Sequence, residues 1–182
     1  MRYHAADVTD AAAVRAVAQD IRDRHGRLDG IVHGAGTLED KLLWDKDPAS
    51  FARVFAGKVD GARHLLSAAG DDTSFLALFG SVAGVFGNRG QADYAAANDA
   101  LDTLARAWSA RTACRVLAVD WGPWAADAGG MVTPELERAY ARRGIPLLDP
   151  EAAVAAFLDE LAHGTSAQVV LAAEAGAEAG DE

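Results

Sequence analysis

Short apolar runs alternate with longer segments of helical periodicity along this sequence. The apolar runs cover residues 28–33, 74–80, 115–120 and 168–172, and the stretches between them have apolar residues at helical spacing. Buried strands of parallel sheets have continuous apolar sequences, and the helices that connect them cover the sheet. The pattern predicts a doubly wound parallel α/β fold in one domain, residues 1–173, followed by a disordered tail, residues 174–182. Ligands of such folds bind at the carboxyl ends of the strands.

Chemical signals mark several boundaries of the predicted elements. Asp10 is a good N-cap for a first helix, which Gly26 ends. Further helices are expected over 48–69, from about 91 onward, over 134–143 and over 150–163. Residues 2–6 are expected to end a strand, and the glycine-rich segment 82–90 is expected to be a loop.

Composition excludes several classes of function. The net charge is −10 over 182 residues, which argues against nucleic acid and anionic membranes as partners, because both require a basic surface. Cys114 is the only cysteine, so neither a disulfide framework nor a cysteine-rich metal site can form, and no metal is expected. No apolar stretch is long enough to span a membrane, and no signal peptide follows Met1. We therefore expect a cytoplasmic protein.

Four polar residues stand out against this background. Lys58 lies on the apolar face of the helix predicted over 48–69, and Ser81 comes directly after the strand predicted over 74–80. Tyr94 and Asn98 are four residues apart, so they share one face of the next helix. Each has an ordinary structural interpretation: a lysine whose stem lies along the core, a turn or cap serine, a core tyrosine and a helix asparagine.

The order and spacing of these four residues resemble the active-site set of the ketoreductase domains of polyketide and polyunsaturated-fatty-acid synthases. These domains are Rossmann-like members of the short-chain dehydrogenase/reductase superfamily. The similarity extends to the strings around the four residues, which are GKVDGARHLL, FGSVAGVFGNRGQADYAAAND and VDWGPW. In the general superfamily a lysine follows the tyrosine by four residues. Here Asn98 takes that place and Lys58 lies upstream, as in the synthase domains.

The resemblance implies catalytic roles for Lys58, Ser81, Tyr94 and Asn98 in reducing a ketone. A phenol with a pKa near 10 is a poor acid at neutral pH, and the ammonium of Lys58 would lower the pKa of Tyr94. Tyr94 would then protonate the ketone oxygen, to which Ser81 would donate a hydrogen bond. Asn98 would support Lys58 or a water that relays protons.

The implied cofactor is NADPH, and several segments resemble its contact regions in this family. Asp7 and Val8 correspond to a motif near the adenine, and Gly34, Ala35 and Gly36 to a turn beside the ribose. Gly122 and Pro123 correspond to a loop whose backbone meets the nicotinamide. Lys58 and Tyr94 complete the expected cofactor contacts. Each segment could also be a plain turn.

A further group of residues is expected to control substrate orientation. Many ketoreductases that form the D (3R) alcohol have Leu-Asp-Asp where this chain has Leu38, Glu39 and Asp40. Phe86 stands where the opposite class has a tryptophan, so the resemblance favours the D product. The other residues expected near the substrate are Gln91 and Met131, the second at the start of a lid. Glu39 and Asp40 could equally be ordinary loop charges.

In complete ketoreductases a strand and a glycine-rich turn hold the pyrophosphate of the cofactor. The resemblance found in this chain does not include these two elements. No such sequence precedes Asp7, so we expect an incomplete sheet with an exposed apolar edge and weak NADPH binding by the chain alone. The expected partners are an acyl carrier protein bearing a 3-oxoacyl thioester and the absent segment or neighbouring synthase domains. Two other functions remain open: a non-catalytic remnant that acts as a scaffold, and a free-standing reductase of a small ketone.

Overall fold

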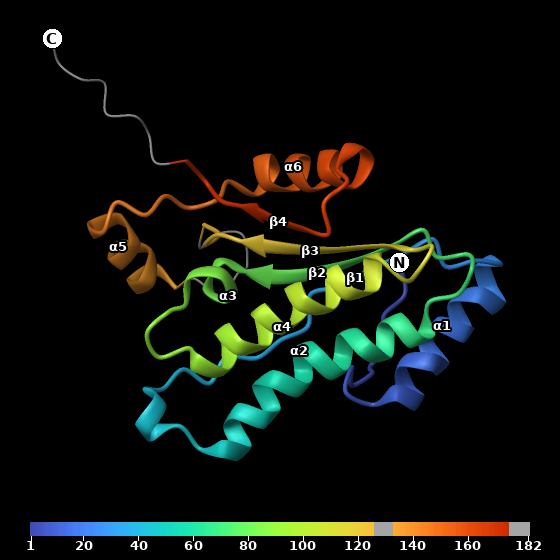
Figure 1. Cartoon of the computed structure of the whole chain (residues 1–182), viewed down its shortest axis with the longest axis horizontal. Helices are drawn as coiled ribbons and strands as arrows, with labels where there is room; N and C mark the ends of the chain where they lie inside the picture. Colours follow the sequence, from blue (N-terminus) through green and yellow to red (C-terminus); the bar gives the residue numbers. More distant parts are fainter. Residues whose placement is uncertain (126–132, 175–182) are drawn as a thin grey trace, which may run out of the picture. The chain divides into compact units, whose positions relative to one another are not determined.

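The computed structural model describes residues 1–125 and 133–174 and contains a four-stranded sheet in the order β1-β2-β3-β4. β1 and β2 run parallel, with Gly30 opposite Phe75 and His33 opposite Leu78. The predicted alternation of strands and helices is therefore confirmed (Figure 1). The strands are β1 (Gly30–His33), β2 (Phe75–Ser81), β3 (Arg115–Trp121) and β4 (Gln168–Leu171).

Four of the five longer helices of the described residues begin at a polar residue whose side chain caps them, and Asp10 is the cap that the sequence predicted. Asp10 accepts hydrogen bonds from the backbone N–H groups of Ala12 and Ala13 at the start of α1, and Gly26 ends that helix with a φ of 80°, which favours glycine. Asp47 caps α2 in the same way, before a proline in its first turn. These helices are α1 (Ala11–His25), α2 (Pro48–Ala68), α4 (Ala92–Ser109), α5 (Pro134–Arg142) and α6 (Pro150–His163).

The chain forms two compact units, of which the first comprises residues 1–120 and 166–169. In this unit α2 packs against α1 and α4, and all three helices lie on one side of β1 and β2 (Figure 1). The core between these layers is fully buried and consists of aliphatic side chains from α2, α4, β2 and β3: Ala62, Leu76, Leu78, Leu101, Ala105, Val116 and Ala118.

The second unit comprises residues 121–165 and 170–182, and its described part contains α5 and α6. Its aromatic centre is Trp121, whose ring packs against Trp124 and against Phe157 of α6. Among the described residues of the whole chain, no helix has the length and apolarity that a membrane span requires.

Two short elements and one absent strand differ from the expectations. Residues 82–86 form a short helix, α3 (Val82–Phe86), because Ser81 caps it, and Leu43–Asp45 form a 3-10 turn. Residues 2–6 are not a strand, and they pair with no strand of the described sheet. Of the expected tail, Glu174 is described and residues 175–182 lie outside the described part.

Candidate active site

Lys58 is buried at the carboxyl end of β2. Its position on the apolar face of α2 leaves the side chain 4% exposed, and its ammonium donates a 2.8 Å hydrogen bond to the carbonyl oxygen of Phe79. Burial lowers the pKa of Lys58 to about 8, and the negative charge of Asp120 opposes this shift. The structure therefore excludes the interpretation in which the ammonium reaches water along the core.

His33, at the end of β1, fixes the backbone of α2 at this point. Its Nε2 lies 2.8 Å from the carbonyl oxygen of Lys58, which requires a proton on Nε2. The ring is 2% exposed, and burial lowers the pKa of His33. A neutral histidine thus anchors the helix turn that carries Lys58. This role was not predicted from the sequence, because the two residues are far apart in the chain.

Tyr94 and Asn98 lie on the first turns of α4, as their spacing predicted. The ammonium of Lys58 is 5.4 Å from the centre of the Tyr94 ring. Asn98 is fully buried, and its Nδ2 donates a 2.7 Å hydrogen bond to the carbonyl oxygen of Tyr94. Its Oδ1 has no hydrogen-bond partner in the described chain, so it remains an acceptor within the site.

Ser81 ends β2 and caps α3. Its Oγ accepts a hydrogen bond from the N–H of Ala83 at 3.2 Å, so its own hydroxyl proton can be donated elsewhere. Gly84 allows α3 to pack directly on α4, because a Cβ there would lie 2.8 Å from the Cβ of Asn98. The cap role and the expected catalytic role of Ser81 are therefore compatible, and α3 links the serine to the helix of Tyr94.

The turn after β1 leaves room beside Lys58. A Cβ on Gly36 would lie 3.2 Å from Cε of Lys58, so a larger residue would crowd this side chain, whereas a Cβ on Gly34 would make only ordinary contact. A lysine ammonium has three donors, and the Phe79 carbonyl takes one of them. The glycine turn and the buried ammonium fit a ligand with hydroxyl groups, such as a ribose. Gly34, Ala35 and Gly36 directly follow β1, where the sequence predicted a turn, and Gly36 lies beside Lys58.

The other segments expected to contact the cofactor have clear local roles. Asp7 accepts two 2.8 Å hydrogen bonds from Thr9, which lower the pKa of its carboxyl group. Val8 packs on α2, where its methyl groups would meet a Cβ on Gly61 at 3.0 Å. Gly122 and Pro123 belong to the second unit, in which the N–H of Gly122 donates to the carbonyl oxygen of Leu171.

Side-chain contacts attach residues 38–46, the loop after the glycine turn, to α2 and to the start of α4. Glu39 forms a pair of hydrogen bonds with Arg53 of α2, which lowers the pKa of Glu39 to about 2. Asp40 accepts a 2.8 Å hydrogen bond from Gln91, so two of the predicted substrate residues meet. Glu39 and Asp40 thus attach the loop to Arg53 and Gln91, and their expected role in orienting the substrate stays a prediction.

A further contact of this loop is a buried ion pair. The ammonium of Lys46 lies 2.7 Å from Oδ2 of Asp93, and the two side chains are 3% and 0% exposed. Lys46 also donates to the carbonyl oxygen of Glu39. Asp93 directly precedes Tyr94, so this pair holds the loop against the turn of α4 that carries the tyrosine. Neither residue was predicted from the sequence to belong to the site.

The remaining substrate residues of the prediction are near the surface or outside the described chain. Leu38 is 36% exposed, and Phe86, the last residue of α3, is 77% exposed. Met131, with the lid expected to begin there, lies outside the described residues.

Comparison with solved structures identifies the class of protein. The chain matches the ketoreductase from the first module of phoslactomycin biosynthesis in Streptomyces sp. HK803 with a TM-score of 0.85 and 34% identity, covering 93% of this chain and 38% of that one. It matches a ketoreductase domain from the bacillaene assembly line with a TM-score of 0.81 and 32% identity, covering 92% and 42%. The fold is that of the short-chain dehydrogenase/reductases, which implies a nicotinamide cofactor.

Residues 1–126 match the family model described as KR domain, and the chain belongs to this family of ketoreductase domains of polyketide-type synthases. It is 38% identical over 151 residues to a polyunsaturated fatty acid synthase of Thraustochytrium sp. (strain ATCC 26185 / S-3), covering 82% of this chain and 5% of the relative. It is also 38% identical over 170 residues to polyketide synthase GfsA of Streptomyces halstedii, covering 92% and 2%. The chain therefore spans a small part of these relatives. The predicted family is confirmed.

Replacing Lys58 with methionine is expected to stabilise the chain at neutral pH. The pKa of Lys58 is lower in the folded chain than the ordinary 10.5, so its ammonium disfavours folding below about pH 8, and this cost fades as the pH rises towards 10.5. We expect the variant to gain about 1–3 kcal/mol at pH 7 and less at pH 10, measured by urea unfolding. Lys41→Met, at an exposed lysine, is the matched control. A Lys58→Met chain that is less stable than the parent at pH 7 would contradict the expectation.

Proposed function

We propose that this chain is the catalytic part of an NADPH-dependent ketoreductase that reduces a 3-oxoacyl thioester, carried by an acyl carrier protein, to the 3-hydroxyacyl thioester. We further propose the D (3R) alcohol as the product. The observation that carries the proposal is the buried ammonium of Lys58, 5.4 Å from the centre of the Tyr94 ring. A buried cation next to a phenol favours the phenolate and makes the phenol a better acid.

In the proposed reaction each of the four residues has a role that its geometry supports. Tyr94 donates its proton to the ketone oxygen as the carbon accepts a hydride, so the C=O bond becomes the C–OH of the product. Ser81 donates a hydrogen bond to the same oxygen, since its cap contact uses only a lone pair of Oγ. Asn98, whose Oδ1 is buried without a partner in the described chain, accepts a hydrogen bond from a water that returns a proton to Tyr94.

The nicotinamide cofactor supplies the hydride when it is bound. Lys58 would hold its ribose hydroxyls with the donors that Phe79 does not take, and the turn at Gly34 and Gly36 would let them approach. Among the described residues these groups have the donor chemistry that a ribose requires. The choice of NADPH over NADH in this proposal is supported by the resemblance to synthase ketoreductases.

The proposed stereochemistry rests on the loop that contains Leu38, Glu39 and Asp40. Asp40 is bound to Gln91, one turn before Tyr94, so the loop is placed at the entrance to the helix that carries the proton donor. Arg53 holds Glu39 on the α2 side. A loop attached at both points can restrict the direction from which an acyl chain enters.

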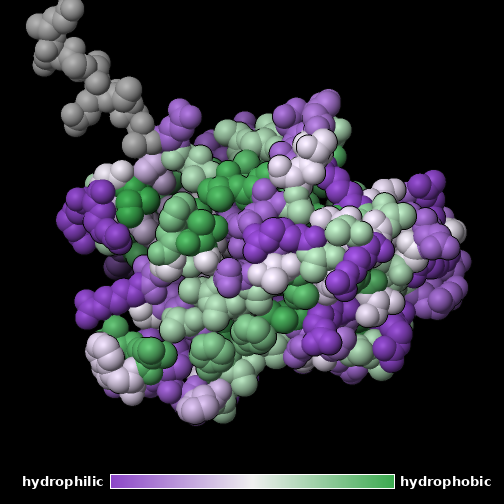
Figure 2. Space-filling view, in the orientation of Figure 1, coloured by the Kyte–Doolittle hydropathy of each residue, from purple (hydrophilic) through white to green (hydrophobic). Residues whose placement is uncertain are grey.

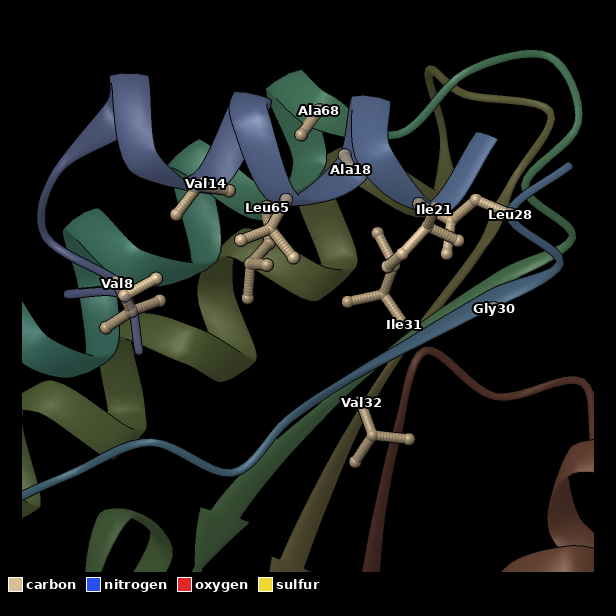
Figure 3. A pocket seen from close by; sticks show the side chains of 12 residues that line it. Val8, Val14, Ala18, Ile21, Leu28, Gly30, Ile31, Val32, Leu65 and Ala68 are labelled. Atoms are coloured by element: carbon tan, nitrogen blue, oxygen red, sulfur yellow. The ribbon is translucent and has the colours of Figure 1, made fainter. Parts of the chain in front are cut away.

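The proposed protein partner is a strand and helix of the same synthase, docked at the free edge of β1. β1 is an edge strand of the described sheet. Beside it lies an apolar groove of about 340 Å³ between β1, α1 and α2 (Figure 3). Figure 3 shows Val14, Ile21 and Ile31 directed into this groove and Val32 on the opposite face of β1.

The surface of α1 that faces solvent differs in polarity from the side chains of this helix that line the groove. Hydrophilic side chains gather over α1 at the right of the view in Figure 2, whereas Val14, Val17, Ala18 and Ile21 of the same helix line the groove. An apolar groove beside an unpaired parallel edge fits an apolar strand that adds to the sheet. Solved ketoreductases have further chain that could supply such a strand, because this chain covers only 38% of the phoslactomycin enzyme.

The test joins this chain to the part of the phoslactomycin ketoreductase that it does not cover. We expect the resulting hybrid to bind NADPH, measured by nucleotide fluorescence, at least 10-fold more tightly than the 182-residue chain alone. It should also convert a 3-oxoacyl thioester to the 3R alcohol, identified by chiral chromatography. A hybrid that binds NADPH but forms no alcohol would overturn the proposed reaction and favour a non-catalytic scaffold, and a 3S product would overturn only the proposed stereochemistry. A hybrid that binds no NADPH would overturn the proposed docking edge.

A further inference from the structure

Two buried carboxyl groups have no place in the proposed reaction. Asp102 of α4 and Asp120 of β3 are 2% and 0% exposed. Oδ2 of Asp120 accepts a 2.8 Å hydrogen bond from Gln168 of β4. The Oδ1 atoms of both carboxylates find no donor in the described chain if both groups are ionised. Two buried, unpaired acceptors with like charges would cost substantial stability.

A single proton resolves this arrangement. The two side chains are within hydrogen-bonding contact of each other, so a proton on one carboxyl group supplies the donor that the other lacks. Burial and the charge of Asp120 raise the pKa of Asp102 to about 7, and burial also raises the pKa of Asp120. Adjacent buried carboxyl groups that share a proton are a recognised arrangement in proteins.

The surroundings indicate which group keeps the negative charge. Gln168 donates to Asp120, and the backbone N–H of Ser81 also favours its ionised form. Around Asp102, the positive charge of Arg106 favours ionisation, and the charge of Asp99 on the same helix opposes it. Asp120 therefore holds the charge and Asp102 the proton.

Asp120 connects this pair to the candidate active site. A Cβ on Gly80 would clash with Oδ1 of Asp120, so the carboxyl group rests against the backbone of β2 directly before Ser81. The charge of Asp120 also opposes the effect of burial on Lys58. The Asp102–Asp120 pair thus lies next to the backbone at Ser81 and is close enough to Lys58 for its charge to affect the pKa of the lysine.

We propose that Asp102 and Asp120 share one proton and act as positioning residues, with the charged Asp120 holding the end of β2 at Ser81 and keeping Lys58 protonated. The positioning role rests on the proposed reductase function, whereas the shared proton does not. Neither residue touches the reacting atoms.

The shared proton is tested by the pH dependence of stability. The pKa of Asp102 is higher in the folded chain than in the unfolded one, so its contribution to stability is full below about pH 4 and is lost as the pH rises through about 7. Asp102→Asn provides a permanent donor to Asp120 and should remove this loss. We expect the variant to melt about 3 °C or more above the parent at pH 8 and to approach it at pH 5. Asp71→Asn, the same change at an exposed site outside the pair, is the matched control.

An Asp102→Asn chain that melts below the parent at pH 8 would mean that both carboxylates are ionised and would overturn the shared proton. The positioning role has a separate readout, the pKa of Lys58 measured by NMR on selectively labelled lysine. Asp120→Asn should lower this pKa below about 8, and Asp102→Asn, which leaves Asp120 charged, should not lower it. An unchanged Lys58 pKa in Asp120→Asn would overturn the electrostatic role, even if the reductase activity itself were demonstrated.

Discussion

Replacing Tyr94 with phenylalanine is expected to lower the turnover number of the hybrid ketoreductase by about 10²–10⁴-fold. The ring stays in place beside Lys58, so the packing of α4 and the hydrogen bond from Asn98 to the backbone of residue 94 should persist. Only the proton that neutralises the ketone oxygen is lost. The measurement is the initial rate of NADPH oxidation with a 3-oxoacyl thioester at saturating substrate.

Three further measurements should show that the loss of turnover is specific to the hydroxyl group of Tyr94. The KM should change little, because the hydroxyl acts mainly in the transition state. The melting temperature should stay within about 3 °C of the parent. Tyr140→Phe, a tyrosine on α5, is the matched control and should keep full activity. If the Tyr94→Phe enzyme retained more than a tenth of the parental turnover, the proton donor would have to be another group and the proposed mechanism would fail.

Replacing Lys46 with methionine is expected to destabilise the chain by about 3–5 kcal/mol. Lys46 and Asp93 form an ion pair of 2.7 Å with side chains 3% and 0% exposed. Removing the cation leaves a buried carboxylate without its partner, whose desolvation is no longer offset. The free energy of unfolding is measured with urea at pH 7, where the slope of the transition should stay constant.

Two further variants separate charge from packing. Arg53→Gln removes the other ion pair of the same loop, in which the Arg53 side chain is 59% exposed, and should cost about 1 kcal/mol or less. Adding Asp93→Asn to Lys46→Met removes the uncompensated charge and should recover a large part of the lost stability. A single Lys46→Met variant that loses no more than Arg53→Gln would show that the buried pair is not a net contributor to the fold.

The consequence for activity follows from the position of this pair. Asp93 directly precedes Tyr94, so the attachment of residues 38–46 to α4 and the placement of the proton donor depend on the same helical turn. The loop with the expected substrate residues is therefore held by a contact that sequence motifs do not reveal. Its partners are 47 residues apart in the chain.

Local patterns were sufficient to predict most elements and the positions that Lys58, Tyr94 and Asn98 occupy on their helices. The caps at Asp10 and Gly26 appear where expected, and the four-residue spacing of Tyr94 and Asn98 places both on one face of α4. Helix periodicity also placed Lys58 on the apolar side of α2. Each of these predictions depends on neighbours within a few residues, whose geometry is largely the same in any fold.

Local patterns did not predict very short elements or contacts between residues that are distant in the chain. The five-residue helix α3 exists because Ser81 caps it and Gly84 lets it pack on α4, and a segment this short has too little propensity to be predicted alone. Asp120 has the pattern of a strand-end residue, yet its contact with Asp102 depends on how α4 packs on the sheet. Glu39 and Asp40 are expected substrate residues, and their contacts with Arg53 and Gln91 could not be predicted because these partners are distant in the chain.

The sequence by itself predicted the family and the class of fold, both of which are confirmed, and the family resemblance made Lys58, Ser81, Tyr94 and Asn98 the expected catalytic residues. Only the tertiary packing determined the protonation states and contacts of the ionisable groups in and around the site. Burial lowers the pKa of Lys58 to about 8, the neutral ring of His33 anchors its helix turn, and Asp102 and Asp120 meet from different elements. The reason is desolvation: a charge changes its pKa and its energy according to the atoms that exclude water around it, and those atoms are distant in sequence.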